Sequence, residues 1–282
     1  MKNNYQVRTM TKKDLDTAVA WAAKEGWNPG LYDTEAFYST DPKGYFMGFL
    51  DDEPVASISA VSYGGQFGFL GFYIVKPEYR SKGYGIKVWN EAIKYLKNHN
   101  IGLDGVVAQQ ENYKKSGFKL AYRNIRYEGY GDDTKTKSDK IVKLSSVPFE
   151  KLVEYDKKLF PASRDQFLSF WIKQPKSLAL GFVDKGELKG YGMVRKCQKG
   201  NKIGPLFSDN AKIAEALFTE LKSFVDPKHP IYLDVPETNK EAVALTKRHK
   251  MKPMFETARM YTKEPPKIDL NKIFGVTTFE LG

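Results

Sequence analysis

Apolar side chains along the first half of the chain follow two different periods, and their alternation predicts a mixed α/β sheet. Residues 12–24 repeat apolar positions every three or four residues, which is the spacing of an amphipathic helix. The run FGFLGFYIV at 67–75 is continuously apolar, as in a buried strand, and 84–97 returns to the helical period. The elements expected next are a strand near 103–107, a short helix near 109–116 and a strand from 118. This alternation is typical of an α/β sheet.

The second half of the chain repeats this plan weakly. It begins with an apolar-periodic helix at 148–159, and its hairpin-like strand pair DKGELKGYGMV (184–194) corresponds to DDEPVASISAV (51–61). The segment FKLAYRNIRY (118–127) aligns without gaps with MKPMFETARM (251–260). The matched residues are Arg126 with Arg259, Tyr122 with Phe255, and Asp104 with Asp234. Several matches in the same order indicate a duplicated domain.

A polar stretch separates the two repeats. The sequence YGDDTKTKSDK at 130–140 lacks apolar periodicity and is typical of a linker. We therefore expect tandem domains at 1–129 and 141–282, each an α/β unit with a mixed sheet.

Composition limits the classes to which this chain can belong. Its 282 residues, 41% of them hydrophobic, can bury a core for each of two domains. The single cysteine, Cys197, excludes a disulfide within the chain, and the three histidines (His99, His229 and His249) are too far apart to suggest a metal cluster. The sequence shows neither a signal peptide nor an apolar run of the roughly 20 residues that cross a bilayer. We expect a cytoplasmic protein that binds neither a metal nor a membrane.

The net charge of +11 raises the question of an anionic partner. The basic residues are scattered among acidic ones, and the densest patches, Lys114–Lys115 and Lys247–Arg248, fall on helical stretches that need a solvated face. We therefore expect no nucleic-acid partner, although part of the charge can serve an anionic cofactor.

The stretch between the apolar strand and the following helix carries the candidate chemistry. The strand ends at Val75, and Gly83 and Gly85 permit a sharp turn that exposes backbone N–H groups. Such groups at a helix N-terminus, together with the helix dipole, bind anions. Arg80 and Lys82 add positive charge. The pattern predicts a pyrophosphate-binding turn, although an ordinary tight turn can contain the same glycines.

Known motifs narrow this prediction. The Walker A pattern G-x-x-x-x-G-K is absent, and Val88 stands where a dinucleotide fingerprint needs its third glycine. Instead, Val75-Lys76-Pro77 followed by R-S-K-G-Y-G (80–85) resembles the acetyl-CoA signature V-x-P-x-x-[RQ]-x-x-G-x-[GA] of the GNAT superfamily of acetyltransferases. Tyr113 begins Y-K-K-S-G-F, which resembles a second family element, Y-x-K-x-G-F. Longer stretches, including FGVTTFELG at the C-terminus, resemble a bacterial subfamily of two-domain acetyltransferases.

The resemblance implies acetyl-CoA as cofactor. In such enzymes the strand that carries Val75 splays from its parallel neighbour, and the pantetheine arm lies in the gap. The resemblance assigns to the cofactor Tyr73, Ile74, Val75, Arg80, Ser81, Lys82, Gly83, Tyr84, Gly85 and Asn112. It also makes Tyr113 the acid that protonates the departing thiolate. A phenol suits this role because its ordinary pKa near 10 keeps it protonated at neutral pH.

The sequence identifies no general base. Many relatives carry a glutamate on the strand before the turn, but FGFLGFYIV has no carboxylate. Asp33, Glu35, Asp41 and Asp104 lie in segments that could face the substrate, yet each is more typical of a cap, a turn or a surface charge. Seven aromatic residues could wall the acceptor pocket, although core packing is the commoner role: Trp21, Trp27, Tyr32, Phe37, Tyr38, Tyr45 and Phe46.

The second half lacks the residues of the turn. Aligned through Pro205, the pairs are Arg80 with Ser208, Gly83 with Ala211, and Gly85 with Ile213. Thr246 falls where Tyr113 stands in the first half. Asp209 would lie beside the helix start, where a negative charge suits a cap and opposes a phosphate. We expect the second half to keep the fold, to lack acetyl-CoA and to shape the acceptor pocket.

These observations favour an N-acetyltransferase that acts on a primary amine of a small molecule, as a monomer or weak homodimer. Two alternatives stay open. One is acetylation of a protein N-terminus or lysine, and the other is a non-catalytic acyl-CoA sensor or nucleic-acid-associated module.

Overall fold

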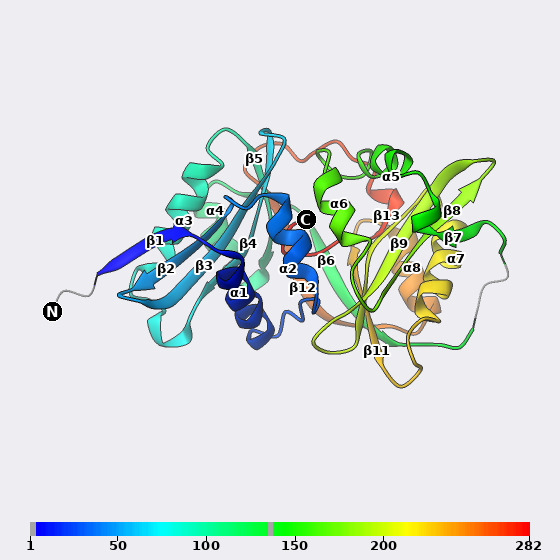
Figure 1. The fold of residues 1–282 in the computed structure, drawn as a ribbon, viewed down its shortest axis with the longest axis horizontal. Coiled ribbons are helices and arrows are strands. Elements are labelled where there is room, and N and C mark those ends of the chain that lie inside the picture. Colours follow the sequence, from blue (N-terminus) through cyan, green and yellow to red (C-terminus); the bar gives the residue numbers. More distant parts are fainter. Residues whose placement is uncertain (1–3, 135–137) are drawn as a thin grey trace.

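The computed structural model describes residues 4–134 and 138–282, and the first half of the chain forms one end of the molecule (Figure 1). Its elements are β1 (Tyr5–Thr9), α1 (Lys12–Lys24), α2 (Asp33–Thr40), β2 (Tyr45–Leu50), β3 (Glu53–Tyr63), β4 (Phe67–Val75), η1 (Pro77–Tyr79), α3 (Tyr84–Tyr95), β5 (Asn100–Val106), η2 (Val107–Gln109), α4 (Gln110–Lys115) and β6 (Lys119–Tyr130). A capping box starts α1, because the Thr11 hydroxyl accepts from the Asp14 N–H while the Asp14 carboxylate accepts from the Thr11 N–H. The predicted helix at 12–24 and strand at 67–75 are confirmed, and the helix predicted at 84–97 ends at Tyr95.

The second half repeats these elements in the same order. They are β7 (Ile141–Lys143), η3 (Leu144–Ser146), α5 (Phe149–Asp156), α6 (Asp165–Trp171), β8 (Ser177–Asp184), β9 (Glu187–Lys196), β10 (Asn201–Ser208), α7 (Ala211–Lys222), β11 (Pro230–Pro236), α8 (Lys240–Arg248) and β12 (Lys252–Tyr261). Two further elements follow, η4 (Leu270–Lys272) and β13 (Ile273–Gly275). The predicted duplication of an α/β fold is therefore confirmed.

The strands of the described residues form one continuous sheet of 13 strands, in the order β1-β2-β3-β4-β5-β12-β6-β11-β10-β9-β8-β7, with β13 paired to β10. The two halves exchange their last strands: β12 pairs with β5 of the first half, and β6 pairs with β11 of the second. At the centre, β6 and β12 pair with each other. Of the expected linker at 130–140, Tyr130 lies in β6, and 135–137 fall outside the described residues.

Two buried ion pairs join the halves at this exchange. Arg126 on β6 donates from Nε and Nη2 to Asp234 on β11, at 2.7 and 2.8 Å. Arg259 on β12 donates from the same atoms to Asp104 on β5, at 2.9 and 2.6 Å. All four side chains are at most 6% exposed. These are the residues that the repeat aligns, so each arginine binds the aspartate of the other half.

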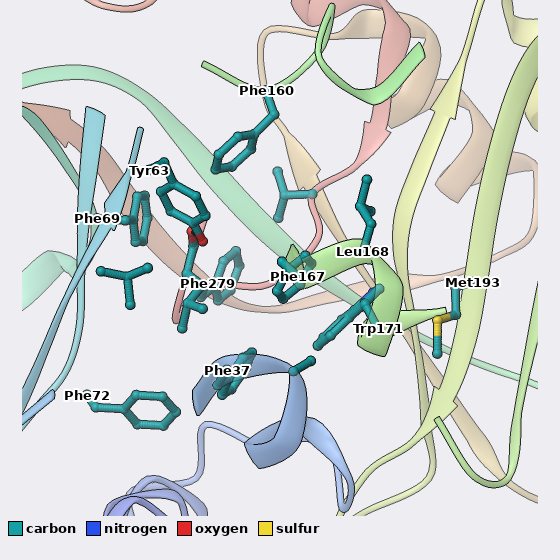
Figure 2. Packing of buried hydrophobic residues seen from close by; sticks show 14 of the residues in the cluster. Phe37, Tyr63, Phe69, Phe72, Phe160, Phe167, Leu168, Trp171, Met193 and Phe279 are labelled. Atoms are coloured by element: carbon teal, nitrogen blue, oxygen red, sulfur yellow. Dashed lines mark hydrogen bonds between the residues drawn. The ribbon is translucent and has the colours of Figure 1, made fainter. Parts of the chain in front are cut away.

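Helices cover both faces of the sheet. On one face, α3 packs against β3 in the first half and α7 against β9 in the second. On the other face, α2 packs against α6, and one apolar core extends across both halves. The Phe37 ring from α2 stacks on Trp171 from α6 with centroids 5.9 Å apart (Figure 2). The two halves are thus one folding unit, joined by shared strands and a shared core.

Two other features of the described residues bear on function. None of their helices is long and apolar enough to cross a membrane. No three of their His, Cys, Asp or Glu side chains gather as ligands for a metal ion.

Candidate active site

The first half contains a gap between two parallel strands. β4 and β5 pair only from Phe67 with Asn100 to Leu70 with Leu103, although β4 continues to Val75. Within the unpaired part, Phe72 has a φ of +47°, in the left-handed region, and its carbonyl accepts from the Ser57 hydroxyl at 2.8 Å. The backbone groups of β4 beyond Leu70 therefore have no strand partner on the β5 side. A cavity of about 630 Å³ opens there. The splayed strands that the family resemblance implied are present.

The turn between β4 and α3 borders this cavity. Gly83 is the N-cap of α3 with a φ of +80°, and no side chain caps the helix. The first backbone N–H groups of α3 are consequently left without a partner in the helix. A Cβ on Gly85 would stand 2.8 Å from the Tyr73 hydroxyl and 2.8 Å from a Val75 methyl, so only glycine fits between strand and helix. Arg80 is held at the rim by hydrogen bonds from Nε to the Val75 carbonyl (2.9 Å) and from Nη2 to Glu25 (2.5 Å).

Tyr113 lines the same cavity from α4. Its ring stacks on Trp89 of α3 with centroids 5.8 Å apart and lies against Gly105, where a Cβ would meet the ring at 2.3 Å. Burial, with a smaller effect from Tyr73, raises the pKa of Tyr113 to about 12. The ring is therefore held in place, and its phenol stays protonated at neutral pH.

Nine of the ten residues that the sequence assigns to the cofactor line this cavity: Tyr73, Ile74, Val75, Arg80, Ser81, Gly83, Tyr84, Gly85 and Asn112. Lys82 is exposed and outside the lining, with its Nζ 5.5 Å from the centre of the Tyr79 ring. Asn112 donates from Nδ2 to Gln109 at 2.7 Å. The predicted residues are thus brought together, with Lys82 at the outer edge.

The four candidate bases are engaged elsewhere. The sequence favoured a cap, a turn or a surface charge for Asp33 and Asp104. Both are instead buried, and they pair with Arg195 and Arg259 respectively. Asp104 reaches the cavity, yet both of its oxygens accept from Arg259. Asp41 accepts from the Ser62 N–H at 2.9 Å and from the Tyr95 hydroxyl, and the exposed Glu35 pairs with Lys12. Of the four, only Asp104 lines the cavity.

The cavity also receives residues that the sequence did not nominate, from the C-terminus and β12. Phe279 and Glu280 line it beside Phe255 and Thr257. Of the seven aromatic residues proposed for the acceptor side, only Trp27 lines it, while Phe37 and Tyr45 are buried in the core. One signal was available in the sequence, because Glu280 is the only charged residue in the apolar tail from 273 to 282.

The corresponding gap of the second half is filled. β10 and β11 pair in parallel only from Asn201 to Ile203, and β13 lies beyond, paired with β10 at Leu206–Phe207. The Val276 N–H then donates to the Asp234 carbonyl at 2.8 Å. A Cβ on Gly275 would stand 2.6 Å from Leu233, so β13 is packed closely against β11 as well.

The helix that follows this second gap is also closed to an anion. Asn210 caps α7, with its side chain accepting from the Ile213 N–H at 3.0 Å. Asn210 therefore supplies the cap for which the sequence favoured Asp209. Asp209 instead pairs with Lys272 at 3.1 Å. In place of Tyr113, Thr246 is buried on α8 and donates its hydroxyl proton to the Val243 carbonyl.

Comparisons with known proteins agree with this geometry. The family described as "Acetyltransferase (GNAT) family" matches residues 10–118, and "Acetyltransferase (GNAT) domain" matches 152–275. The chain is 30% identical over 262 residues to holothin acyltransferase of Pseudoalteromonas sp. (strain SANK 73390), covering 93% of this chain and 89% of that one.

Solved structures share the fold along nearly the whole chain. A putative acetyltransferase from Pyrococcus horikoshii superposes with a TM-score of 0.84 at 23% identity, covering 100% of this chain and 99% of that one. A tandem GNAT protein from the clavulanic acid biosynthesis pathway gives a TM-score of 0.64 at 12% identity, covering 93% and 100%. The chain belongs to the GNAT family of acyltransferases, with two GNAT domains in tandem.

Proposed function

We propose that this acyltransferase moves an acetyl group from acetyl-CoA to a primary amine of a small molecule, by direct attack of the amine on the thioester. The observation that carries the proposal is that one cavity joins an uncapped helix N-terminus, an unpaired strand edge and a protonated phenol. The division at 1–129 and 141–282, a cytoplasmic location and a monomeric or weakly dimeric state stay predictions.

The residues around the cavity fit acyl-CoA. Backbone N–H groups from Ser81 to Gly85, with the charge of Arg80, would hold the pyrophosphate. The unpaired edge of β4 after Leu70 would hold the pantetheine arm through backbone hydrogen bonds. Acyl-CoA supplies an activated thioester when it is bound. Backbone N–H groups of β4 are suited to polarise its carbonyl.

Tyr113 has the chemical role of acid. Its pKa of about 12 keeps the phenol protonated throughout the neutral range, so it can donate a proton to the sulfur as the C–S bond breaks. Trp89 and Gly105 hold the ring in one orientation, so the hydroxyl is already oriented before each turnover.

A small acceptor is favoured because both halves enclose the cavity. Phe255 and Phe279 come from the second half, and Trp27 from the first. An extended peptide would need an open groove. The relative named as an acyltransferase of holothin supports the same assignment.

The test is thiol release from acetyl-CoA with a panel of small amines, amino acids, lysine peptides and N-terminal peptides. We expect turnover with small amines, and a fall in kcat of about 100-fold in Tyr113→Phe with the Kd for acetyl-CoA unchanged. Turnover with peptides alone would favour the protein acetyltransferase. Tight acetyl-CoA binding without turnover would favour the sensor, and a salt-sensitive shift of DNA or RNA would favour the nucleic-acid module.

A further inference from the structure

Glu280 is a buried carboxylate in the cavity that also contains Tyr113. Glu280 is 3% exposed and lies on the C-terminal tail shortly after β13. The same short segment therefore fills the gap of the second half and then delivers a carboxylate to the gap of the first. No residue of β4 itself could supply this group, because FGFLGFYIV contains no acid.

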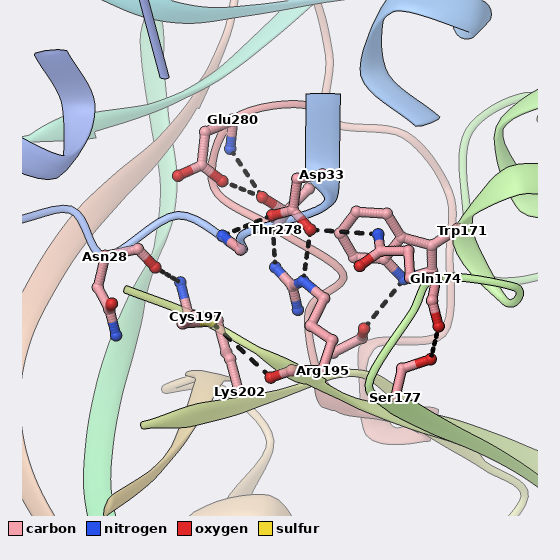
Figure 3. A network of polar contacts seen from close by, with 12 residues as sticks. Asn28, Asp33, Trp171, Gln174, Ser177, Arg195, Cys197, Lys202, Thr278 and Glu280 are labelled. Atoms are coloured by element: carbon pink, nitrogen blue, oxygen red, sulfur yellow. Dashed lines mark hydrogen bonds and ion pairs between the residues drawn. The ribbon is translucent and has the colours of Figure 1, made fainter. Parts of the chain in front are cut away.

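The hydrogen bonds of Glu280 leave one oxygen available. Oε2 accepts from the Thr278 hydroxyl, whose oxygen in turn accepts from the Glu280 N–H at 3.3 Å. Within residues 4–134 and 138–282, no group donates a hydrogen bond to Oε1. Figure 3 shows this oxygen pointing away from Thr278 and from the neighbouring pair of Asp33 and Arg195.

Glu280 differs in this respect from the other buried carboxylates of the described chain. Each of those is at most 2% exposed and pairs with an arginine, namely Asp33 with Arg195, Asp104 with Arg259, Asp156 with Arg164, and Asp234 with Arg126. Glu280 has no ion pair among these residues. A buried carboxyl oxygen without a hydrogen-bond donor is costly, which indicates a partner that arrives with the substrate.

Three cationic side chains lie near Glu280 but do not pair with it. Arg126 on β6, Arg195 on β9 and Lys202 on β10 all interact with it electrostatically. None of them neutralises it by contact, because Arg126 and Arg195 bind aspartates and the Lys202 ammonium donates to the Asn28 carbonyl at 3.0 Å. Among the described residues, the Glu280 carboxyl group is thus in contact with no cationic side chain.

The tail is fixed on β4, so the carboxylate has a defined position. A Cβ on Gly71 would stand 2.1 Å from the Glu280 carbonyl oxygen, which places the tail directly against the unpaired part of β4. The Tyr63 hydroxyl donates to the Leu281 carbonyl at 3.0 Å, and the Gly282 N–H donates to the Thr278 carbonyl at 3.2 Å. Both contacts hold the residues on either side of Glu280.

We propose that Glu280 is the proton acceptor for the acceptor amine: Oε1 binds its ammonium group and removes a proton before attack. This inference rests on the proposed function. Of the three ammonium protons, one stays on the amide nitrogen and one passes to Glu280 and then to solvent. The third replaces the proton that Tyr113 gives to the sulfur. The N–C bond forms as the C–S bond breaks, so the products are the amide and the free thiol.

The walls beside Glu280 define the class of acceptor. Trp27, Phe255 and Phe279 line the cavity together with it. The Arg126 guanidinium already lies over Phe279 and Phe255, at 4.9 and 5.8 Å from the ring centres, so these rings are suited to bury an apolar body. The acceptor is accordingly a small ammonium compound with an apolar or aromatic body.

The test compares wild type with Glu280→Gln, which keeps the shape of the side chain but cannot take a proton. Free alkylamines have a pKa near 10, so without a base only the small neutral fraction reacts. At pH 7 we expect kcat/KM to fall about 100-fold. The difference in kcat/KM between the two enzymes should shrink as the pH rises to 9.5, because the neutral fraction of the amine grows about tenfold per pH unit. With hydroxylamine, which is already neutral at pH 7, the two enzymes should differ by less than about fivefold.

The controls separate this inference from the proposed function and from misfolding. The matched variant Glu187→Gln, at the exposed start of β9, should equal wild type. Thermal unfolding and acetyl-CoA affinity report folding independently. A deficit of equal size at every pH and with both nucleophiles would mean that Glu280 is only structural, and full activity of Glu280→Gln would exclude it as the base. Absence of wild-type turnover with every amine would instead contradict the proposed function.

Discussion

The two halves of this chain contain the same gap between parallel strands, but only one gap is open. In the first half, β4 and β5 separate after Leu70, and α3 begins at an uncapped glycine. In the second, β13 lies in the corresponding place and Asn210 caps α7. The two halves therefore share a backbone plan, while local differences leave only the first helix start without a side-chain cap. A strand inserted into the second gap uses the same backbone groups that a pantetheine arm would use in the first.

The comparison also shows how the halves depend on each other. The segment that closes the second gap continues into the first half, where it places Phe279 and Glu280 in the cavity. The exchanged strands β6 and β12 make the sheet continuous. A separated first half would thus lack β12, the tail and, with them, Phe255 and Phe279 of its own cavity.

The largest expected effect tests whether the strand exchange is symmetrical. Asp234→Asn and Asp104→Asn each leave a buried arginine without its counter-ion, which should lower the free energy of unfolding by about 3–5 kcal/mol. Urea unfolding followed by tryptophan fluorescence measures both. The exposed Asp184→Asn, which breaks a surface pair with Lys140, serves as the control. A large loss for only one of the two buried aspartates would show that the exchange is not equivalent in the halves.

The next prediction replaces Gly85, in the turn of the first half, by isoleucine, the residue that aligns with it in the second half. Gly85→Ile would place a side chain against Tyr73 and Val75 and across the first turn of α3. Losing two charge-assisted hydrogen bonds to phosphate costs about 3 kcal/mol, so the Kd for acetyl-CoA should rise about 100-fold. Isothermal titration calorimetry measures the change. The matched variant Ile213→Ala, in the second half, should leave the Kd as it is. Equal affinity in Gly85→Ile and wild type would contradict the binding role of this turn.

A smaller effect distinguishes the two helix starts. Asn210→Ala removes the cap of α7 and should cost about 1 kcal/mol of stability without changing acetyl-CoA affinity. Gly83→Ala should also cost about 1 kcal/mol, because Gly83 has a φ of +80°. Only the second variant should weaken acetyl-CoA binding, since Gly83 lines the cavity at the start of α3. Weaker binding in Asn210→Ala would mean that the second half also serves the cofactor.

The features that the sequence predicts are those determined by residues close together in the chain. The turn from Val75 to Gly85 was recognisable because glycines, a proline and charges at fixed spacing determine its shape locally. The repeat was visible because Arg126 and Arg259 occupy equivalent places. The ion pairs that these arginines form across the halves were not predictable, because β6 and β12 have similar patterns and nothing local decides which neighbour each one takes.

The parts of the site that the sequence did not predict are contacts between segments that are far apart in the chain. β13 has three apolar residues, which resemble any core strand, so its place in the second gap could not be read from sequence. Glu280 reaches β4 only because Gly71 leaves room for the tail. Conversely, Asp33 and Asp104 looked available as bases because their arginine partners are far along the chain.

The smallest effect concerns Tyr113, the proposed acid of the first half, for which the second half has Thr246. An ordinary tyrosine with a pKa near 10 would be half ionised at pH 10, and an enzyme that needs its proton would then lose half of its kcat. Burial raises the pKa of Tyr113 to about 12, so the phenol keeps its proton at pH 10 and loses it only as pH approaches 12. At saturating amine, kcat should therefore change by less than about 10% between pH 9 and 10. Trp89→Leu removes a ring that buries Tyr113, so its pKa should fall and the decline should move to lower pH. An unchanged profile in Trp89→Leu would show that the alkaline limit belongs to another group.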